Sequence, residues 1–224
     1  MSLPKSDWAI IITGAGSSTR FGQGNKLLAD LNGHPVFMHS VLAFAGLVEK
    51  ENFVLTVPAV CRSEFEDVLL KYQMLDKITL VNGGSCRSES VALALGALHL
   101  DSGRVAIHDA ARPLAAKELM SSLLSKSENI ITGRRIYDSV KRIGENGQIL
   151  EAVDRTGLFR AETPQVFDLA SYRQALVRTA GCEFTDDAQM MQSAGFPVFT
   201  FCDDAPNLKI TSFSDLEKCR ELVR

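Results

Sequence analysis

The chain has 224 residues, 46% of them hydrophobic, and a net charge of −3, which is typical of one soluble globular domain. This charge excludes a bulk basic surface for nucleic acid or an acidic membrane, so anion binding would need locally grouped cations. The five scattered cysteines form no CxxC pair and no run reaches 18 apolar residues, so we expect a cytoplasmic protein without a zinc site, disulfide scaffold or membrane partner.

Short apolar runs alternate with helical patterns along the first 136 residues. Strands are predicted over 8–13, 52–57, 77–81, 104–109 and 129–136, and helices over 35–47, 61–73, 88–100 and 116–126. Because the strand runs lack polar alternation, we expect an α/β fold in which a mostly parallel sheet lies between helices. Ligands of such sheets bind beyond the carboxyl ends of the strands.

The alternation breaks at residues 137–156, where two extended segments flank Asn146-Gly147, a strong hairpin signal. A lone two-stranded ribbon is marginal in water, so we expect this inserted arm to pack on another surface, such as a second subunit. Beyond the arm we predict helices over 168–180 and 186–195, a strand over 197–202, and a last helix over 213–223 capped by Ser212 or Ser214. The chain is read as one domain, 1–224, with one arm.

The loop TGAGSSTRFGQGNK, residues 13–26, follows the first predicted strand. It is not a Walker loop, because it has no Gly-Lys pair, and Thr19 replaces the third glycine of a dinucleotide fingerprint. Composition alone fits a mobile surface loop with two solvated cations equally well. However, backbone N–H groups of a Gly-rich bend can cradle phosphate, and Arg20 and Lys26 add charge, so we predict a triphosphate site.

Seven sequence blocks in a fixed order carry a resemblance to a known family: IITGAGSSTRFGQGNKLL, GGSCRSESV, HDAARP, DSVKR, VDRTGLFRAETPQVF, FTDDA and NLKIT. Together they resemble 2-C-methyl-D-erythritol 4-phosphate cytidylyltransferase of the non-mevalonate isoprenoid pathway. The resemblance implies a Rossmann-like nucleotidyltransferase fold, a homodimer, CTP and Mg²⁺. It also implies the reaction, in which the phosphate of the substrate attacks the α-phosphate of CTP and pyrophosphate leaves.

The resemblance also assigns roles to residues around the nucleotide. It implies that Arg20, Lys26 and Lys209 are the catalytic cations and that Asp109 binds the metal. The expected nucleotide contacts lie in two loops and are Gly14, Ala15, Gly16, Gly83, Gly84 and Ser90. The second loop would hold cytosine, although its plain interpretation is a helix-capping turn with Ser85 or Ser88 as the cap, and both can hold together.

The remaining matches concern the second substrate. By resemblance, Arg112, Ser139, Arg155 and Thr163 bind methylerythritol phosphate, and the arm carries Ser139 and Arg155 across to the partner subunit. Ser139 stands where the family usually has threonine, which keeps the hydroxyl and loses a methyl group. Outside the matched contacts, His108 is expected to be structural, because the nucleophile is already an anion, and Asp186 and Asp187 to cap the next helix or fix a neighbouring cation.

Three alternative functions stay open. A ribitol-phosphate or other polyol-phosphate cytidylyltransferase would share the nucleotide half and differ only in the arm. A nucleotidyltransferase that uses UTP or ATP shares the Gly-rich loop, but GGSCRSESV and HDAARP together favour cytosine. A regulatory nucleotide-binding module would not need cations at both ends of the phosphate chain.

Overall fold

The computed structural model describes residues 7–16, 21–22 and 24–223. Within this part, a seven-stranded sheet has the order β11-β7-β10-β6-β1-β4-β5. Its strands are β1 (Trp8–Thr13), β4 (Phe53–Val57), β5 (Thr79–Asn82), β6 (Arg104–Asp109), β7 (Ile130–Arg135), β10 (Phe159–Asp168) and β11 (Phe199–Cys202). Neighbouring strands are parallel except at β10, which is antiparallel to both β6 and β7. The predicted α/β fold with a mostly parallel sheet is confirmed.

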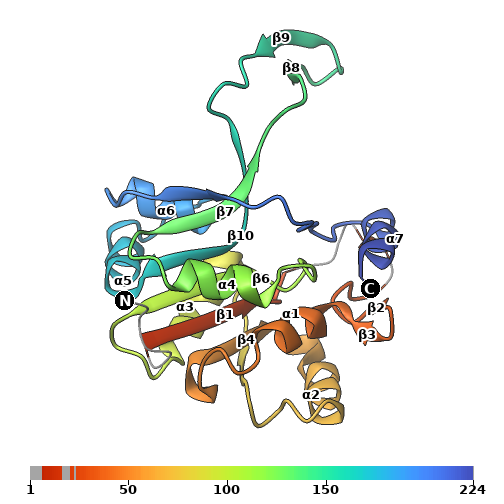
Figure 1. The fold of residues 1–224 in the computed structure, drawn as a ribbon, viewed down its shortest axis with the longest axis vertical. Helices are drawn as coiled ribbons and strands as arrows, with labels where there is room; N and C mark the ends of the chain where they lie inside the picture. The colour runs from red at the N-terminus through yellow and green to blue at the C-terminus, as the bar shows by residue number, and fades with distance from the viewer. Residues whose placement is uncertain (1–6, 17–20, 23, 224) are drawn as a thin grey trace.

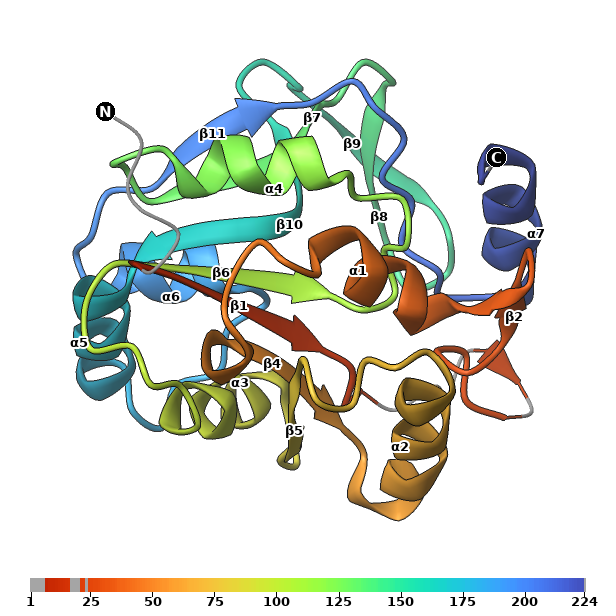
Figure 2. The ribbon, with the colours of Figure 1, turned by 60° about the horizontal axis from the view of Figure 1, so that its bottom comes forward.

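Helices cover both faces of this sheet (Figure 1, Figure 2). One apolar core includes side chains of α1 (Val36–Phe44), α2 (Arg62–Lys71), α4 (Lys117–Leu124) and α7 (Phe213–Leu222). The other includes side chains of α3 (Arg87–Gly96), α5 (Leu169–Arg178) and α6 (Asp187–Ser193). Alternate residues of β1 enter the two cores, Ile10 and Ile12 on one face and Ile11 on the other. Strand β1 therefore has no solvent face, which explains its uninterrupted apolar sequence.

Strand β10 is the main element that the sequence analysis missed. Its sequence, FRAETPQVFD, mixes charged residues with Pro164, and a proline argues against a central strand because it cannot donate to the ladder. The structure accommodates it at an irregularity, where the register of β10 against β7 shifts between Ala161 and Gln165. Four short elements were also not predicted: β2 (Asp30–Leu31), β3 (His34–Pro35) and the 3₁₀ turns η3 (Lys50–Asn52) and η4 (Ala59–Cys61).

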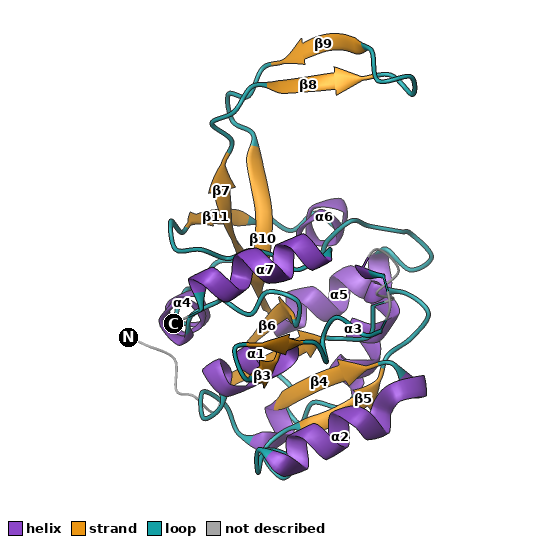
Figure 3. Cartoon of the chain, turned by 90° about the vertical axis from the view of Figure 1, so that its right-hand side faces the viewer, coloured by secondary structure: helices purple, strands orange, loops and turns teal. Residues whose placement is uncertain are grey.

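The predicted arm is present as the antiparallel hairpin of β8 (Val140–Ile143) and β9 (Ile149–Val153). It extends away from the sheet and its helices (Figure 1, Figure 3). The hairpin carries three large apolar residues that are 62%, 62% and 59% exposed, namely Ile143, Ile149 and Leu150. The hairpin therefore presents an apolar surface that the body of the same chain does not cover.

Two predicted helix caps have different outcomes. Helix α7 begins after Ser212, whose side chain forms a capping box with Asp215, so Ser212 rather than Ser214 is the cap. Helix α3 begins after Cys86 without a side-chain cap, so the prediction of Ser85 or Ser88 was wrong. The carboxylate of Glu89 instead accepts from the backbone N–H and the hydroxyl of Ser85, at 2.6 and 2.7 Å.

Candidate nucleotide site

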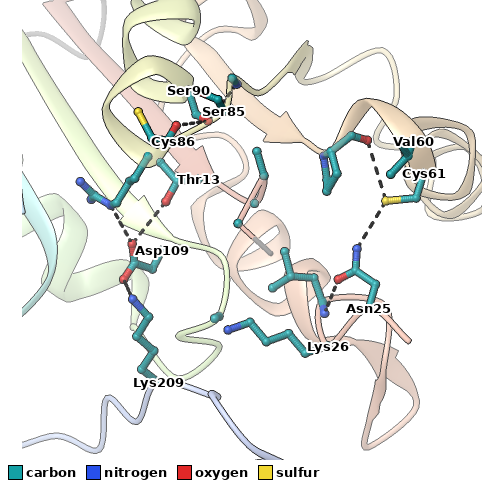
Figure 4. A pocket seen from close by; sticks show the side chains of 18 of the residues that line it. Thr13, Asn25, Lys26, Val60, Cys61, Ser85, Cys86, Ser90, Asp109 and Lys209 are labelled. Atoms are coloured by element: carbon teal, nitrogen blue, oxygen red, sulfur yellow. Dashed lines mark hydrogen bonds and ion pairs between the residues drawn. The ribbon is translucent and has the colours of Figure 1, made fainter. Parts of the chain in front are cut away.

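A cavity of about 670 Å³ lies beyond the carboxyl ends of four neighbouring parallel strands (Figure 4). Its lining includes Thr13 at the end of β1, Pro58 after β4, Gly84 after β5 and Asp109 at the end of β6. This is the edge at which open α/β sheets bind their ligands. The loop that follows β1 lines the cavity through Gly14, Ala15, Gly16 and Lys26.

Two glycines allow the loops of this cavity to approach each other closely. The backbone N–H of Gly14 donates to the carbonyl of Thr56 at 2.9 Å, and a Cβ on Gly14 would lie 2.7 Å from that oxygen. A Cβ on Gly83 would lie 2.0 Å from the Cβ of Ala15, closer than two carbons can pack. The two predicted nucleotide loops therefore contact each other at Gly83 and Ala15, and a larger residue than glycine at position 83 would force them apart.

Ser90 holds the second loop in shape. Its side chain is 3% exposed, and its hydroxyl accepts from the N–H of Gly84 at 3.1 Å and donates to the carbonyl of Cys86 at 2.9 Å. These two hydrogen bonds tie the turn from Gly83 to Cys86 to the first part of α3. Ser90 borders the cavity, and its contact with a base stays a prediction.

Asp109 is the centre of the charged part of the cavity (Figure 4). Its Oδ2 accepts from Lys209 Nζ at 2.7 Å and lies 3.7 Å from Arg112 Nε. Its Oδ1 lies 3.5 Å from Arg87 Nε and accepts from the Thr13 hydroxyl at 3.3 Å. Burial favours a raised pKa, but the charges of Arg87 and Lys209 outweigh it and hold the pKa of Asp109 well below its usual range. The carboxylate is therefore ionised.

Lys26 reaches the same cavity from the loop after β1. Its Nζ donates to the carbonyl of Ile210 at 2.9 Å, and Ile210 directly follows Lys209 in the chain. Segments that are far apart in the sequence thus place two predicted catalytic cations on the cavity that Asp109, the predicted metal ligand, also lines. Arg20, the third predicted cation, lies outside the described residues.

The model of one family, IspD or 2-C-methyl-D-erythritol 4-phosphate cytidylyltransferase, matches residues 8–224. The chain belongs to this family. A cytidylyltransferase of that name from Rhodopirellula baltica is 35% identical over 93% of this chain and 91% of its own length. One from Endomicrobium trichonymphae is 32% identical over 96% and 98%. A crystal structure of the Thermus thermophilus enzyme has a TM-score of 0.79 at 26% identity, over 96% of this chain and 97% of that one.

The residues matched to the second substrate of the cytidylyltransferase family do not all lie together. Arg112 is close to Asp109 and donates from Nη1 to the carbonyl of Asn207 at 2.9 Å. Thr163 is 4% exposed, and its hydroxyl accepts from the backbone N–H of Asp109 at 3.0 Å, so it supports the site from within the protein. Ser139 and Arg155 lie in the arm region, and Arg155 lines a second cavity of about 490 Å³.

His108 has the structural position that the sequence analysis expected. The imidazole is fully buried, with Nε2 3.1 Å from the carbonyl of Arg112 and Nδ1 3.3 Å from the Thr163 hydroxyl. Burial lowers the pKa of His108 to about 4, so the ring is neutral at physiological pH. The neutral, buried imidazole of His108 therefore supports the end of β6, where Asp109 lies.

Sequence reasoning missed one charged residue of the site, Arg87. It lines the cavity and forms ion pairs with both Asp109 and Asp187. The block GGSCRSESV contains this arginine, but its partners are 22 and 100 residues away in the chain. The expectations for Asp186 and Asp187 are both confirmed, because Asp186 caps α6 and Asp187 fixes a cation.

Proposed function

We propose that this chain transfers the cytidylyl group of CTP to 2-C-methyl-D-erythritol 4-phosphate in the cavity lined by Lys26, Asp109 and Lys209. The observation that carries the proposal is the convergence of these three residues from separate segments in a member of this enzyme family. Relatives with the same name extend over nearly the whole chain. The reaction is the transferase step of isoprenoid biosynthesis for which the family is named.

The chemistry requires positioning and charge more than a base. A phosphate oxygen of methylerythritol phosphate attacks the α-phosphorus of CTP, the bond from that phosphorus to the bridging oxygen breaks, and pyrophosphate leaves with the electron pair. The nucleophile is already an anion, so nothing must be deprotonated. Lys26 and Lys209 supply positive charge where negative charge gathers, which is the main source of catalysis in such transfers.

We propose Mg²⁺ as the cofactor, held by Asp109. Among the described residues that line the cavity, Asp109 is the only carboxylate, and no group of three or more His, Cys, Asp or Glu in the described ranges could hold a metal. That donor set suits Mg²⁺, which takes one or two carboxylates and fills its shell with water and substrate phosphates. Bound there, the ion would neutralise charge on the phosphates.

We also propose that the active enzyme is a homodimer in which the arm of one chain completes the site of the other. The support is the exposed apolar surface of the hairpin, next to which Tyr137 is 76% exposed. Within one chain Arg155 lies outside the cavity that holds Asp109. Burying such a ribbon against a second copy would remove the cost of exposing it.

The cytoplasm is the proposed location. All five cysteines are free thiols in the structure, and reducing compartments preserve such thiols. Separately, none of the helices in the described ranges is both long and apolar enough to cross a membrane.

Pyrophosphate release tests the proposed reaction. We expect release with CTP, Mg²⁺ and methylerythritol phosphate, and much slower release when ribitol 5-phosphate replaces the alcohol or UTP replaces CTP. Equal rates with ribitol phosphate would contradict the substrate assignment.

The shared site has its own test, in which Arg155→Ala subunits are mixed with Lys26→Ala subunits. Heterodimers contain some sites with both groups, so activity should return on mixing. Absence of any recovery, with exchange of subunits shown by native mass spectrometry, would contradict the dimer proposal.

A further inference from the structure

A chain of charged contacts extends from the cavity into the second core. Arg87, the first residue of α3, lies between two carboxylates, with Nε 3.5 Å from Asp109 Oδ1 and Nη1 2.7 Å from Asp187 Oδ2. Asp187 Oδ1 in turn accepts from the hydroxyl of Tyr172 at 2.6 Å. The chain therefore links α5, α6 and α3 to the carboxyl end of β6.

The inner part of this chain is enclosed. Asp187 is 4% exposed and Tyr172 is 1% exposed, whereas the Arg87 side chain is 31% exposed at the cavity. Burial raises the pKa of Tyr172 well above its usual range, so its hydroxyl remains a proton donor to Asp187. The contact between Arg87 Nη1 and Asp187 Oδ2 is a close ion pair.

The position of Asp187 is not explained by the needs of helix α6. The neighbouring Asp186 already caps that helix, because its Oδ1 accepts from the N–H of Gln189 at 2.9 Å, and its Oδ2 accepts from Gln165 at 3.0 Å. Burying a carboxylate and a guanidinium costs desolvation energy that their attraction often does no more than offset. The pair of buried Asp187 with Arg87, which also contacts Asp109 at the cavity, is therefore better explained by its effect on the position of Asp109.

We propose that Asp187 is a positioning residue for cytidylyl transfer: held by Tyr172, it anchors Arg87, and the anchored guanidinium fixes Asp109 at the nucleotide cavity. Arg87 and Lys209 then have different roles at Asp109. Arg87 is tied to a buried partner at its other end, whereas the Lys209 side chain is 41% exposed. Arg87 orients the Asp109 carboxylate from the side of the protein interior, and Lys209 lies on the side where the ligand would bind. This inference rests on the proposed function of the cavity.

The test uses four variants of the full chain: Asp187→Asn, Arg87→Met, the double variant, and Asp186→Asn as a matched control. Asp186→Asn changes a neighbouring carboxylate at the same helix end, so it reports the effect of losing a carboxylate there without touching Arg87. Each variant is measured for its melting temperature, for kcat and KM of CTP over a series of Mg²⁺ concentrations, and for the Kd of CTP with Mg²⁺ by calorimetry.

We expect Asp187→Asn to lower kcat/KM for CTP by about 10- to 100-fold and to raise the half-saturating Mg²⁺ concentration, as loss of an outer partner of a metal ligand typically does. The Kd of CTP should rise about tenfold on the same grounds. Asp186→Asn should keep both constants within about twofold of wild type, because asparagine caps a helix about as well as aspartate does. Because Asp187 acts through Arg87, the double variant should be no more impaired than Arg87→Met.

Two results would overturn the inference. One is Asp187→Asn kinetics and calorimetry that match those of Asp186→Asn, and the other is additive losses in the double variant. If Asp187→Asn does not fold, Tyr172→Phe removes only the hydroxyl and should reduce kcat/KM by about two- to tenfold; an unchanged value would overturn the inference equally. Wild-type enzyme without turnover or CTP binding would instead refute the proposed function, so the two failures are distinguishable.

Discussion

Replacing Lys209 with methionine removes one positive charge from the cavity and keeps most of the aliphatic stem. In the structure the ammonium lies 2.7 Å from Asp109 Oδ2, and Arg87 and Arg112 also face that carboxylate. Asp109 therefore stays paired in the variant, and the site is not left with an isolated buried charge. The main loss is the cation that we propose to stabilise the phosphates during transfer.

The size of this loss follows from the kind of contact. Removing one preorganised donor that acts on developing charge costs about 3 kcal/mol, which corresponds to about a hundredfold decrease in kcat. The Lys209 side chain is 41% exposed, so its ion pair with Asp109 is screened and contributes at most about 1 kcal/mol to stability. The variant should therefore be folded and nearly inactive.

Pyrophosphate release at saturating CTP and methylerythritol phosphate measures kcat, and thermal unfolding checks the fold. Lys218→Met is the matched control, because Lys218 is an exposed lysine on α7 and does not line the cavity. We expect the control to keep wild-type kcat within about twofold. A Lys209→Met enzyme with kcat within about threefold of wild type would refute the reasoning.

Three other predictions concern the nucleotide loop, the last helix and the arm. Cys86 is exposed, lines the cavity and has its pKa lowered by a hydrogen bond with Ser88. Iodoacetamide should therefore label it faster than Cys182, and CTP should slow the Cys86 reaction but not the Cys182 reaction, as read by peptide mass spectrometry. Hydrogen bonds to Asp215 outweigh its burial and lower its pKa to about 2. The stabilisation from the ionised carboxylate should therefore be complete above about pH 5 and lost toward pH 2. Urea unfolding should show that Asp215→Asn lowers the free energy of unfolding by about 1 kcal/mol at pH 7 and by less in acid, and a loss that does not change with pH would count against the capping role. Arg155→Ala should raise KM for methylerythritol phosphate about tenfold and leave the Kd of CTP near wild type, whereas weakened CTP binding would speak against its assignment to the second substrate.

The parts of the fold that follow from local pattern could be predicted. The apolar run of β1 is long enough and unbroken enough to specify a buried strand, and Asn146-Gly147 specifies a hairpin turn, in which Gly147 has a φ of +81°. Strand β10 could not be predicted in this way, because Pro164 is acceptable only where the pairing register shifts. That shift depends on a neighbouring strand and leaves no local signal.

The same distinction holds at the site. Lys26, Asp109 and Lys209 were assigned from motifs, and the structure places all three on one cavity. Arg87 was missed because its role depends on Asp187, which lies 100 residues away in the chain. The two side chains come into contact only when α3 and α6 pack on the same face of the sheet. Sequence motifs give residue types near a ligand, whereas buried supports behind them appear only in three dimensions.

A crystal structure with CTP and Mg²⁺ tests the central claim most directly. The account predicts that the triphosphate lies in the cavity with phosphate oxygens on Lys26 and Lys209, that the metal lies on Asp109, and that cytosine meets the turn at Gly83 and Gly84. A nucleotide bound elsewhere, or a triphosphate that contacts neither lysine, would contradict it.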